Sequence, residues 1–163
     1  MILIAIGANL PGPAGPPRAQ AEVALARLEA AGVTIVRRSR WYESAPVPVS
    51  DQPRYVNGVA QIATQLAPEP LLTIMHEVEA ALGRKRGALN AARTVDLDLL
   101  DHDGQCRSGP AAPILPHPRL HQRAFVLKPL AEIAPEWRHP TLGRTAVELL
   151  ADLPPDVDVR PLP

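Results

Sequence analysis

A stretch of alternating side chains at residues 94–100 constrains the fold most strongly. Its sequence, TVDLDLL, places Asp96 and Asp98 between the apolar residues Val95, Leu97 and Leu99. Side chains alternate between the two faces of a β-strand, so the aspartates share one face and the apolar residues share the other. The segment is therefore predicted to be a β-strand with one carboxylate face and one apolar face.

The carboxylate face predicts a cation site. The two carboxylates would lie roughly 7 Å apart along the strand and would repel each other without a cation between them. Oxygen ligands beside Arg93 favour Mg²⁺ that carries a polyphosphate. Alone, the pair is equally consistent with a solvated strand face. The neighbouring Arg84, Lys85 and Arg86 favour phosphate binding, because an arginine fork can hold two phosphate oxygens.

The order of the elements up to residue 100 predicts the fold class. Strands are expected at 2–6, 33–42, 55–66 and 94–100, and helices at 19–31 and 68–82. This β-α-β-β-α-β order is that of the split βαβ, or ferredoxin-like, pattern. An α+β fold is predicted, with an antiparallel sheet, these two helices on one face, and loops along an edge and over the other face.

The remaining segments are mostly loops. Residues 11–17, 44–53 and 84–92 are expected to be irregular, and a turn at Asp103 and Gly104 predicts a short partner strand near Gln105. Further helices are expected at 122–133 and 145–150. No repeat and no long linker divides the chain, so a single domain over residues 1–163 is predicted.

Composition excludes several classes of function. The 17 basic and 17 acidic residues cancel, so no net charge draws the chain to nucleic acid or to a membrane. One cysteine, Cys106, fits a reducing compartment, and the apolar start is too short for a signal peptide or a membrane span, so a cytoplasmic protein is expected. P-loop, protein-kinase and serine-nucleophile motifs are missing, as is zinc-ligand spacing.

Two further groups of residues are candidates for ligand binding. Tyr55 and Asn57 would share a strand face and offer a ring and an amide, which suits a planar heterocycle that carries an amide. Ordinary strand packing is the simpler interpretation of this pair. The segment 115–125 contains His117, Arg123 and Phe125, of which the first two could reach phosphate and the third could stack on a ring.

Together these segments resemble the 6-hydroxymethyl-7,8-dihydropterin pyrophosphokinase family of folate biosynthesis. The segments that carry the resemblance are IAIGANL at 4–10, DQPRYVN at 51–57, Glu79 with LGR at 82–84, RTVDLDLL at 93–100, PH at 116–117, RAFVL at 123–127 and PLAEIAP at 129–135. The resemblance covers nearly the whole chain. It implies a three-layer α-β-α arrangement with mobile active-site loops.

The resemblance also implies a reaction. ATP would transfer pyrophosphate to the hydroxymethyl oxygen of 6-hydroxymethyl-7,8-dihydropterin and leave as AMP. Asp96 and Asp98 would bind two Mg²⁺ ions, and Arg84 and Arg93 would clamp the phosphates and act in catalysis. The pterin would contact Ser44, Ala45, Val47, Tyr55, Asn57 and Phe125. ATP would contact His76, Glu79, Arg84, Arg86, Arg93, Leu99, His117 and Arg123.

Two other functions are alternatives for this sequence. A ferredoxin-like RNA-binding sheet needs exposed aromatic side chains and a positive face, and this chain is 3 % aromatic with no net charge. Another Mg²⁺-dependent phosphoryl or nucleotidyl transferase on the same fold is the alternative, and Tyr55, Asn57 and Phe125 argue against it. The resemblance suggests a monomer, with no nucleic acid and no membrane as partner.

Overall fold

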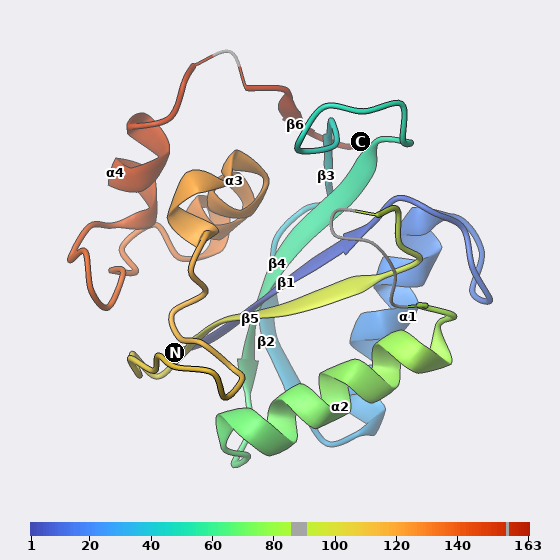
Figure 1. Ribbon diagram of the computed structural model, residues 1–163, viewed down its shortest axis with the longest axis horizontal. Helices are drawn as coiled ribbons and strands as arrows, with labels where there is room; N and C mark the ends of the chain where they lie inside the picture. The colour runs from blue at the N-terminus through green and yellow to red at the C-terminus, as the bar shows by residue number, and fades with distance from the viewer. Residues whose placement is uncertain (86–90, 156) are drawn as a thin grey trace.

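An antiparallel sheet of six strands forms the centre of the protein (Figure 1). The computed structural model describes residues 1–85, 91–155 and 157–163. The strands are β1 (Ile2–Ala8), β2 (Thr34–Arg38), β3 (Tyr42–Ser44), β4 (Tyr55–Ala63), β5 (Asp96–His102) and β6 (Val159–Pro161). Their order across the sheet is β5-β1-β4-β3-β6, and β2 also pairs with β4. This arrangement confirms the antiparallel sheet that was predicted from the sequence.

Helices cover both faces of the sheet, in three layers. They are α1 (Pro17–Ala30), α2 (Pro68–Ala81), α3 (Ala124–Ile133) and α4 (Ala146–Ala151), and a 3₁₀ turn (Leu120–Gln122) precedes α3. Figure 1 shows α1 and α2 on one side of the strands, with α3 and α4 on the other. Within the described ranges, no helix is both long and apolar enough to cross a membrane.

Two apolar clusters hold these layers together, and they follow the alternation of the strands. Val95, Leu97 and Leu99 are buried in the cluster between the sheet and the pair α1 and α2. Leu100 and Val59 are buried in the cluster beneath α3 and α4. The predicted apolar face of residues 94–100 is therefore confirmed. The carboxylate face of the same strand lies on the α3 side of the sheet, where loops alone had been expected from the element order.

The predicted single strand at 33–42 is wrong, because the chain breaks there into β2 and β3. Both strands pair with β4, β2 along residues 60–63 and β3 along residues 55–57. At the break, the Ser39 hydroxyl accepts a hydrogen bond from the backbone N–H of Val59 at 3.0 Å, and the Trp41 side chain is buried against Gly58. A side chain thus replaces part of the regular backbone ladder.

Two other predictions in the second half of the chain need correction, and one strand was not predicted. The strand expected near Gln105 does not form. The Gln105 side chain instead bonds the His102 ring at 3.1 Å, and the chain turns toward an isolated bridge between Arg107 and Leu115. The helix expected from residue 122 begins at Ala124, since Arg123 has an extended backbone. The sequence reasoning also missed β6, whose three residues are too few to show a periodic pattern.

Gly58 supplies a prediction about stability. A Cβ at this position would lie 2.6 Å from a carbon of the Trp41 ring, well inside normal contact. We expect Gly58→Ala to lower the free energy of unfolding by about 2 kcal/mol, because the ring must move within a packed core. Urea unfolding followed by circular dichroism measures this loss. The double variant Gly58→Ala/Trp41→Leu should regain part of it, and a double variant less stable than either single one would contradict the explanation.

Candidate active site

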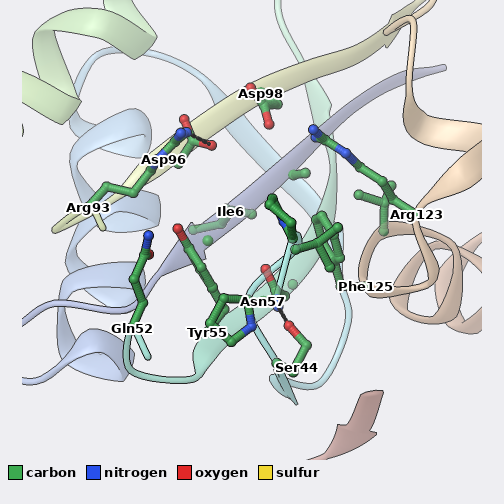
Figure 2. A pocket seen from close by; sticks show the side chains of 18 residues that line it. Ile6, Ser44, Gln52, Tyr55, Asn57, Arg93, Asp96, Asp98, Arg123 and Phe125 are labelled. Atoms are coloured by element: carbon green, nitrogen blue, oxygen red, sulfur yellow. Dashed lines mark hydrogen bonds and ion pairs between the residues drawn. The ribbon is translucent and has the colours of Figure 1, made fainter. Parts of the chain in front are cut away.

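A cleft crosses the sheet on the face that carries α3, and it gathers most of the residues singled out in the sequence (Figure 2). It extends over the neighbouring strands β5, β1 and β4 and ends against the loop after β3 and the start of α3. Its lining residues are Ala5, Ile6, Gly7, Ser44, Ala45, Pro46, Val47, Pro48, Gln52, Tyr55, Asn57, Gly58, Arg93, Asp96, Asp98, Arg123, Phe125 and Val126.

Small residues on β1 form the floor of the cleft. Gly7 pairs with Asp96 of β5 on one side and with Asn57 of β4 on the other. Ala5 likewise pairs with Asp98. A Cβ on Gly7 would lie 3.1 Å from Oδ1 of Asn57. The central strand therefore leaves open the space between the carboxylates of β5 and the polar side chains of β4, and sequence reasoning did not single out either small residue.

One end of the cleft holds a cluster of opposite charges around Asp96. Its two carboxylate oxygens accept hydrogen bonds from Nη1 of Arg84 at 2.6 Å and from Nη1 of Arg93 at 2.7 Å. Arg84 also pairs with Glu79, which is 2 % exposed and accepts the backbone N–H of Leu97 at 2.8 Å. Burial raises the pKa of the Glu79 carboxyl. The predicted neighbourhood of Arg84, Arg93, Asp96 and Glu79 is thus present in the structure.

Asp98 is held differently from Asp96. It forms no ion pair with any residue that the structure describes, and Arg123 faces it across the cleft (Figure 2). Burial raises the pKa of Asp98 to about 7, the charge of Asp96 adds to the rise, and Arg123 opposes it. A half-buried carboxylate without a bound cation is poorly stabilised in its charged form. The site can therefore accept additional positive charge at Asp98.

The other end of the cleft offers rings and amide groups. Asn57 is 5 % exposed and donates from Nδ2 to the Ser44 hydroxyl at 2.6 Å. Tyr55 of β4 and Phe125 of α3 line the cleft on either side of this pair (Figure 2). The guanidinium of Arg123 lies over the Phe125 ring, 5.4 Å from its centre. This end fits a planar group with hydrogen-bonding edges, and the backbone of residues 44–48 forms its rim.

The remaining predicted site residues lie outside the lining of the cleft. His117 is half-buried near Arg123, and burial together with Arg123 and Arg119 lowers the pKa of its ring to about 4, so the ring is neutral at pH 7. The Leu99 side chain is buried in the cluster on the opposite face of the sheet. His76 is exposed on α2. Arg86 lies outside the described residues.

Asn9 and Gln52 support the site and were not singled out from the sequence as site residues. Asn9 is 1 % exposed, and its side-chain oxygen accepts the backbone N–H of Arg93 at 2.9 Å. Its amide nitrogen donates to the Gln52 side chain at 3.2 Å and to the Pro53 carbonyl at 3.0 Å. The end of β1 therefore fixes both Arg93 and the loop that precedes Tyr55. The residues Gly-Ala-Asn directly after an apolar strand were the available signal.

Comparison with known proteins identifies the family. The model of the 7,8-dihydro-6-hydroxymethylpterin-pyrophosphokinase (HPPK) family matches residues 3–135. The chain belongs to this family. An enzyme named 2-amino-4-hydroxy-6-hydroxymethyldihydropteridine pyrophosphokinase from Pseudomonas aeruginosa is 42 % identical over 154 residues, which cover 94 % of this chain and 91 % of that protein. The enzyme of the same name from Synechocystis is 36 % identical over 149 residues, 91 % of this chain and 73 % of that protein.

Solved structures of HPPK proteins share the fold. The crystal structure of a Plasmodium falciparum HPPK-DHPS triple mutant superposes with a TM-score of 0.69 at 13 % sequence identity. The match covers 92 % of this chain and 43 % of that longer protein. The fold, the family and the enzyme class expected from the sequence are confirmed. As a pyrophosphokinase of folate synthesis, the chain transfers pyrophosphate from ATP, its co-substrate, to hydroxymethyldihydropterin.

The raised pKa of Asp98 predicts a cost in stability. Since the folded state holds this proton more tightly than an unfolded carboxyl of pKa 3.8, stability without ligands should fall as the pH rises from about 4 to about 7. Asp98→Asn removes the charge and should raise the free energy of unfolding at pH 8 by up to about 4 kcal/mol, with the gain vanishing near pH 4. Thermal melts in EDTA across this pH range measure it.

The exposed Asp51 offers a matched control. Asp51→Asn should show no such pH-dependent gain. A gain for Asp98→Asn that is equal at pH 4 and pH 8 would contradict the assignment of the buried charge.

Proposed function

We propose that the cleft is the site of pyrophosphate transfer, with the pterin at its aromatic end and the ATP phosphates at its charged end. The observation that carries this proposal is that the two ends of the cleft are adjacent on the sheet. Asp96, Gly7 and Asn57 lie side by side on three neighbouring strands. A hydroxymethyl group that projects from a ring at Asn57 would therefore point toward phosphates held at Asp96.

The aromatic end would bind the pterin ring. Tyr55 and Phe125 would stack on its two faces, because both side chains line the cleft on either side of Asn57. Asn57, held by Ser44, and the backbone of Ser44, Ala45 and Val47 would bond the polar edge of the ring. A buried amide with a fixed partner orients a ring more precisely than a flexible surface group would.

The charged end would bind the triphosphate together with two Mg²⁺ ions at Asp96 and Asp98. Both side chains supply oxygen, and Asp98 forms no direct ion pair with any described residue. No third acidic, histidine or cysteine side chain completes a metal cluster there in the described ranges. Such a site suits Mg²⁺, which typically binds one or two carboxylates and takes its other ligands from phosphate and water. When bound, the ions would neutralise the charge of the transferring phosphates.

Arg84 and Arg93 would act on the transferring group. Both guanidinium groups are bonded to Asp96. We expect them to turn part of their N–H groups to phosphate oxygens once cations neutralise Asp96. The pterin hydroxyl oxygen would then attack the β-phosphorus, the bond to the α-phosphate oxygen would break, and AMP would leave. Fixed donors that meet charge as it develops lower the barrier of such a step.

The other residues of the proposed ATP site lie at the edge of the cleft or outside its lining. Arg123 lines the α3 end of the cleft, neutral His117 lies near Arg123, and both would contact phosphate or ribose. Glu79 would act through Arg84, and Leu99 through its backbone. His76 and Arg86 keep the role implied by the family resemblance. The chain would work as one domain and as a monomer, since a single chain supplies both ends of the cleft. The cytoplasm is the compartment expected from the sequence.

Product analysis tests the reaction. Incubation with ATP, Mg²⁺ and 6-hydroxymethyl-7,8-dihydropterin should give AMP and the pterin diphosphate, resolved by ion-exchange chromatography. Omission of the pterin should leave ATP intact. Formation of ADP would indicate a phosphoryl transferase instead, and EDTA should abolish turnover if the metal assignment is correct.

Arg93→Ala tests the proposed role in the transition state. We expect kcat to fall roughly 100-fold or more, with a rise in the KM for ATP of less than about ten-fold, because the contact should strengthen as the β-phosphorus is attacked. Steady-state kinetics with both substrates measure the two parameters. Arg27→Ala, at an exposed position on α1, should leave both unchanged. A large change in KM with normal kcat would make Arg93 a ground-state binding residue.

A further inference from the structure

The C-terminal strand β6 lies outside the part of the chain that matches the family model, which ends at residue 135. It nevertheless completes the sheet beside β3 (Figure 1). β3 is only three residues long and ends at Ser44, the partner of Asn57. Short strands have few ladder hydrogen bonds, so the position of Ser44 depends on the strands that flank it on both sides.

The pairing places β6 next to the aromatic end of the cleft. Val159 of β6 pairs with Ser44, and Ser44 pairs with Tyr55 on the other side. The Val159 side chain is 6 % exposed and belongs to a small apolar cluster with Tyr42 and Ala124, against which Phe125 packs. One residue of β6 thus supports both Ser44 and Phe125.

Ion pairs of the Arg54 guanidinium hold β6 in this position. Arg54 donates from Nη1 and Nη2 to the two carboxylate oxygens of Asp158, at 2.7 and 2.9 Å. Its Nε donates to Glu43 of β3 at 2.6 Å. Arg54 directly precedes Tyr55, so one guanidinium ties together β3, the start of β4 and the start of β6. Two parallel hydrogen bonds fix direction as well as distance.

Other contacts support the same placement. Lys128 of α3 donates to the Val159 carbonyl at 2.7 Å, and the backbone N–H of Leu162 donates to the Trp41 carbonyl at 2.8 Å. The charged end of the cleft lies across β1, on β5, and receives no contact of this kind from β6. The effect of β6 should therefore fall on one substrate only.

We propose that Arg54 and Asp158 are positioning residues for the pterin, which act by clamping β6 against β3. The inference rests on the proposed placement of the two substrates. If the clamp keeps Ser44 and Phe125 in their binding arrangement, its loss lowers the fraction of molecules that can bind the pterin, and the apparent affinity falls by that fraction. ATP affinity and kcat at saturation should stay close to wild type.

The test compares Arg54→Ala, Asp158→Ala and the double variant by calorimetric titration with 6-hydroxymethyl-7,8-dihydropterin and, separately, with a non-hydrolysable ATP analogue and Mg²⁺. We expect the Kd for the pterin to rise about three- to ten-fold in Asp158→Ala, with the Kd for the ATP analogue within about two-fold. In the Arg54→Ala background, Asp158→Ala should add little, since its partner is already missing. Circular dichroism establishes that each variant is folded.

The ion pair between Arg144 and Asp152, which lie on either side of α4 and are joined at 2.8 Å, provides the control. Arg144→Ala removes a comparable surface ion pair and should change neither Kd. A wild-type pterin Kd in Asp158→Ala, or an equal loss of affinity for both ligands, would overturn the proposal. Failure of the wild-type protein to form AMP would instead overturn the proposed function, so the two failures are distinguishable.

Discussion

The guanidinium groups of Arg84 and Arg93 hold Asp96 from both sides, while Asp98, two residues along the same strand, has no such partner among the described residues. Glu79, which is buried and pairs with Arg84, adds a third carboxyl group whose charge acts on Asp98. Such a group of like charges is costly to fold, and the arginines offset only part of that cost. This imbalance of charge supports the proposal that the site binds cations and phosphate together.

The surrounding structure keeps this charge cluster in place. Gln20 of α1 is fully buried and accepts the Ala14 N–H at 2.7 Å, and its amide donates to the carbonyls of Leu82 and Thr94 at 2.8 and 3.3 Å. It therefore joins the end of α2, just before Arg84, to the start of β5. Asn9 performs the corresponding function for Arg93. Polar side chains inside the fold thus set the spacing of the groups that are proposed to contact phosphate.

The small residues of β1, the strand between β5 and β4, are equally important. Gly7 separates Asp96 from Asn57 without filling the space between them, so a substrate can span two chemically different ends of one cleft. Neighbouring strands lie about 4.8 Å apart, and this spacing brings a ring over β4 within reach of phosphates over β5. In the proposed function, the same sheet that forms the core therefore sets the distance between the reacting groups.

The sequence by itself determined the elements that depend on local pattern. The alternation of Asp96 and Asp98 with leucines required a two-faced strand, and the order of strands and helices determined the antiparallel sheet, because both follow from side-chain periodicity. The ordered motifs between residues 4 and 135, taken together, indicated the family. These features need no knowledge of distant contacts.

Tertiary structure alone decided which of those residues face one another. Nothing local in the sequence shows that Arg123 faces Asp98, or that Gly7 forms the floor of the cleft. The break between β2 and β3 depends on Trp41 meeting Gly58, and β6 depends on a partner strand more than a hundred residues earlier in the chain. Such pairings arise from packing between distant segments, which periodicity along the chain does not encode.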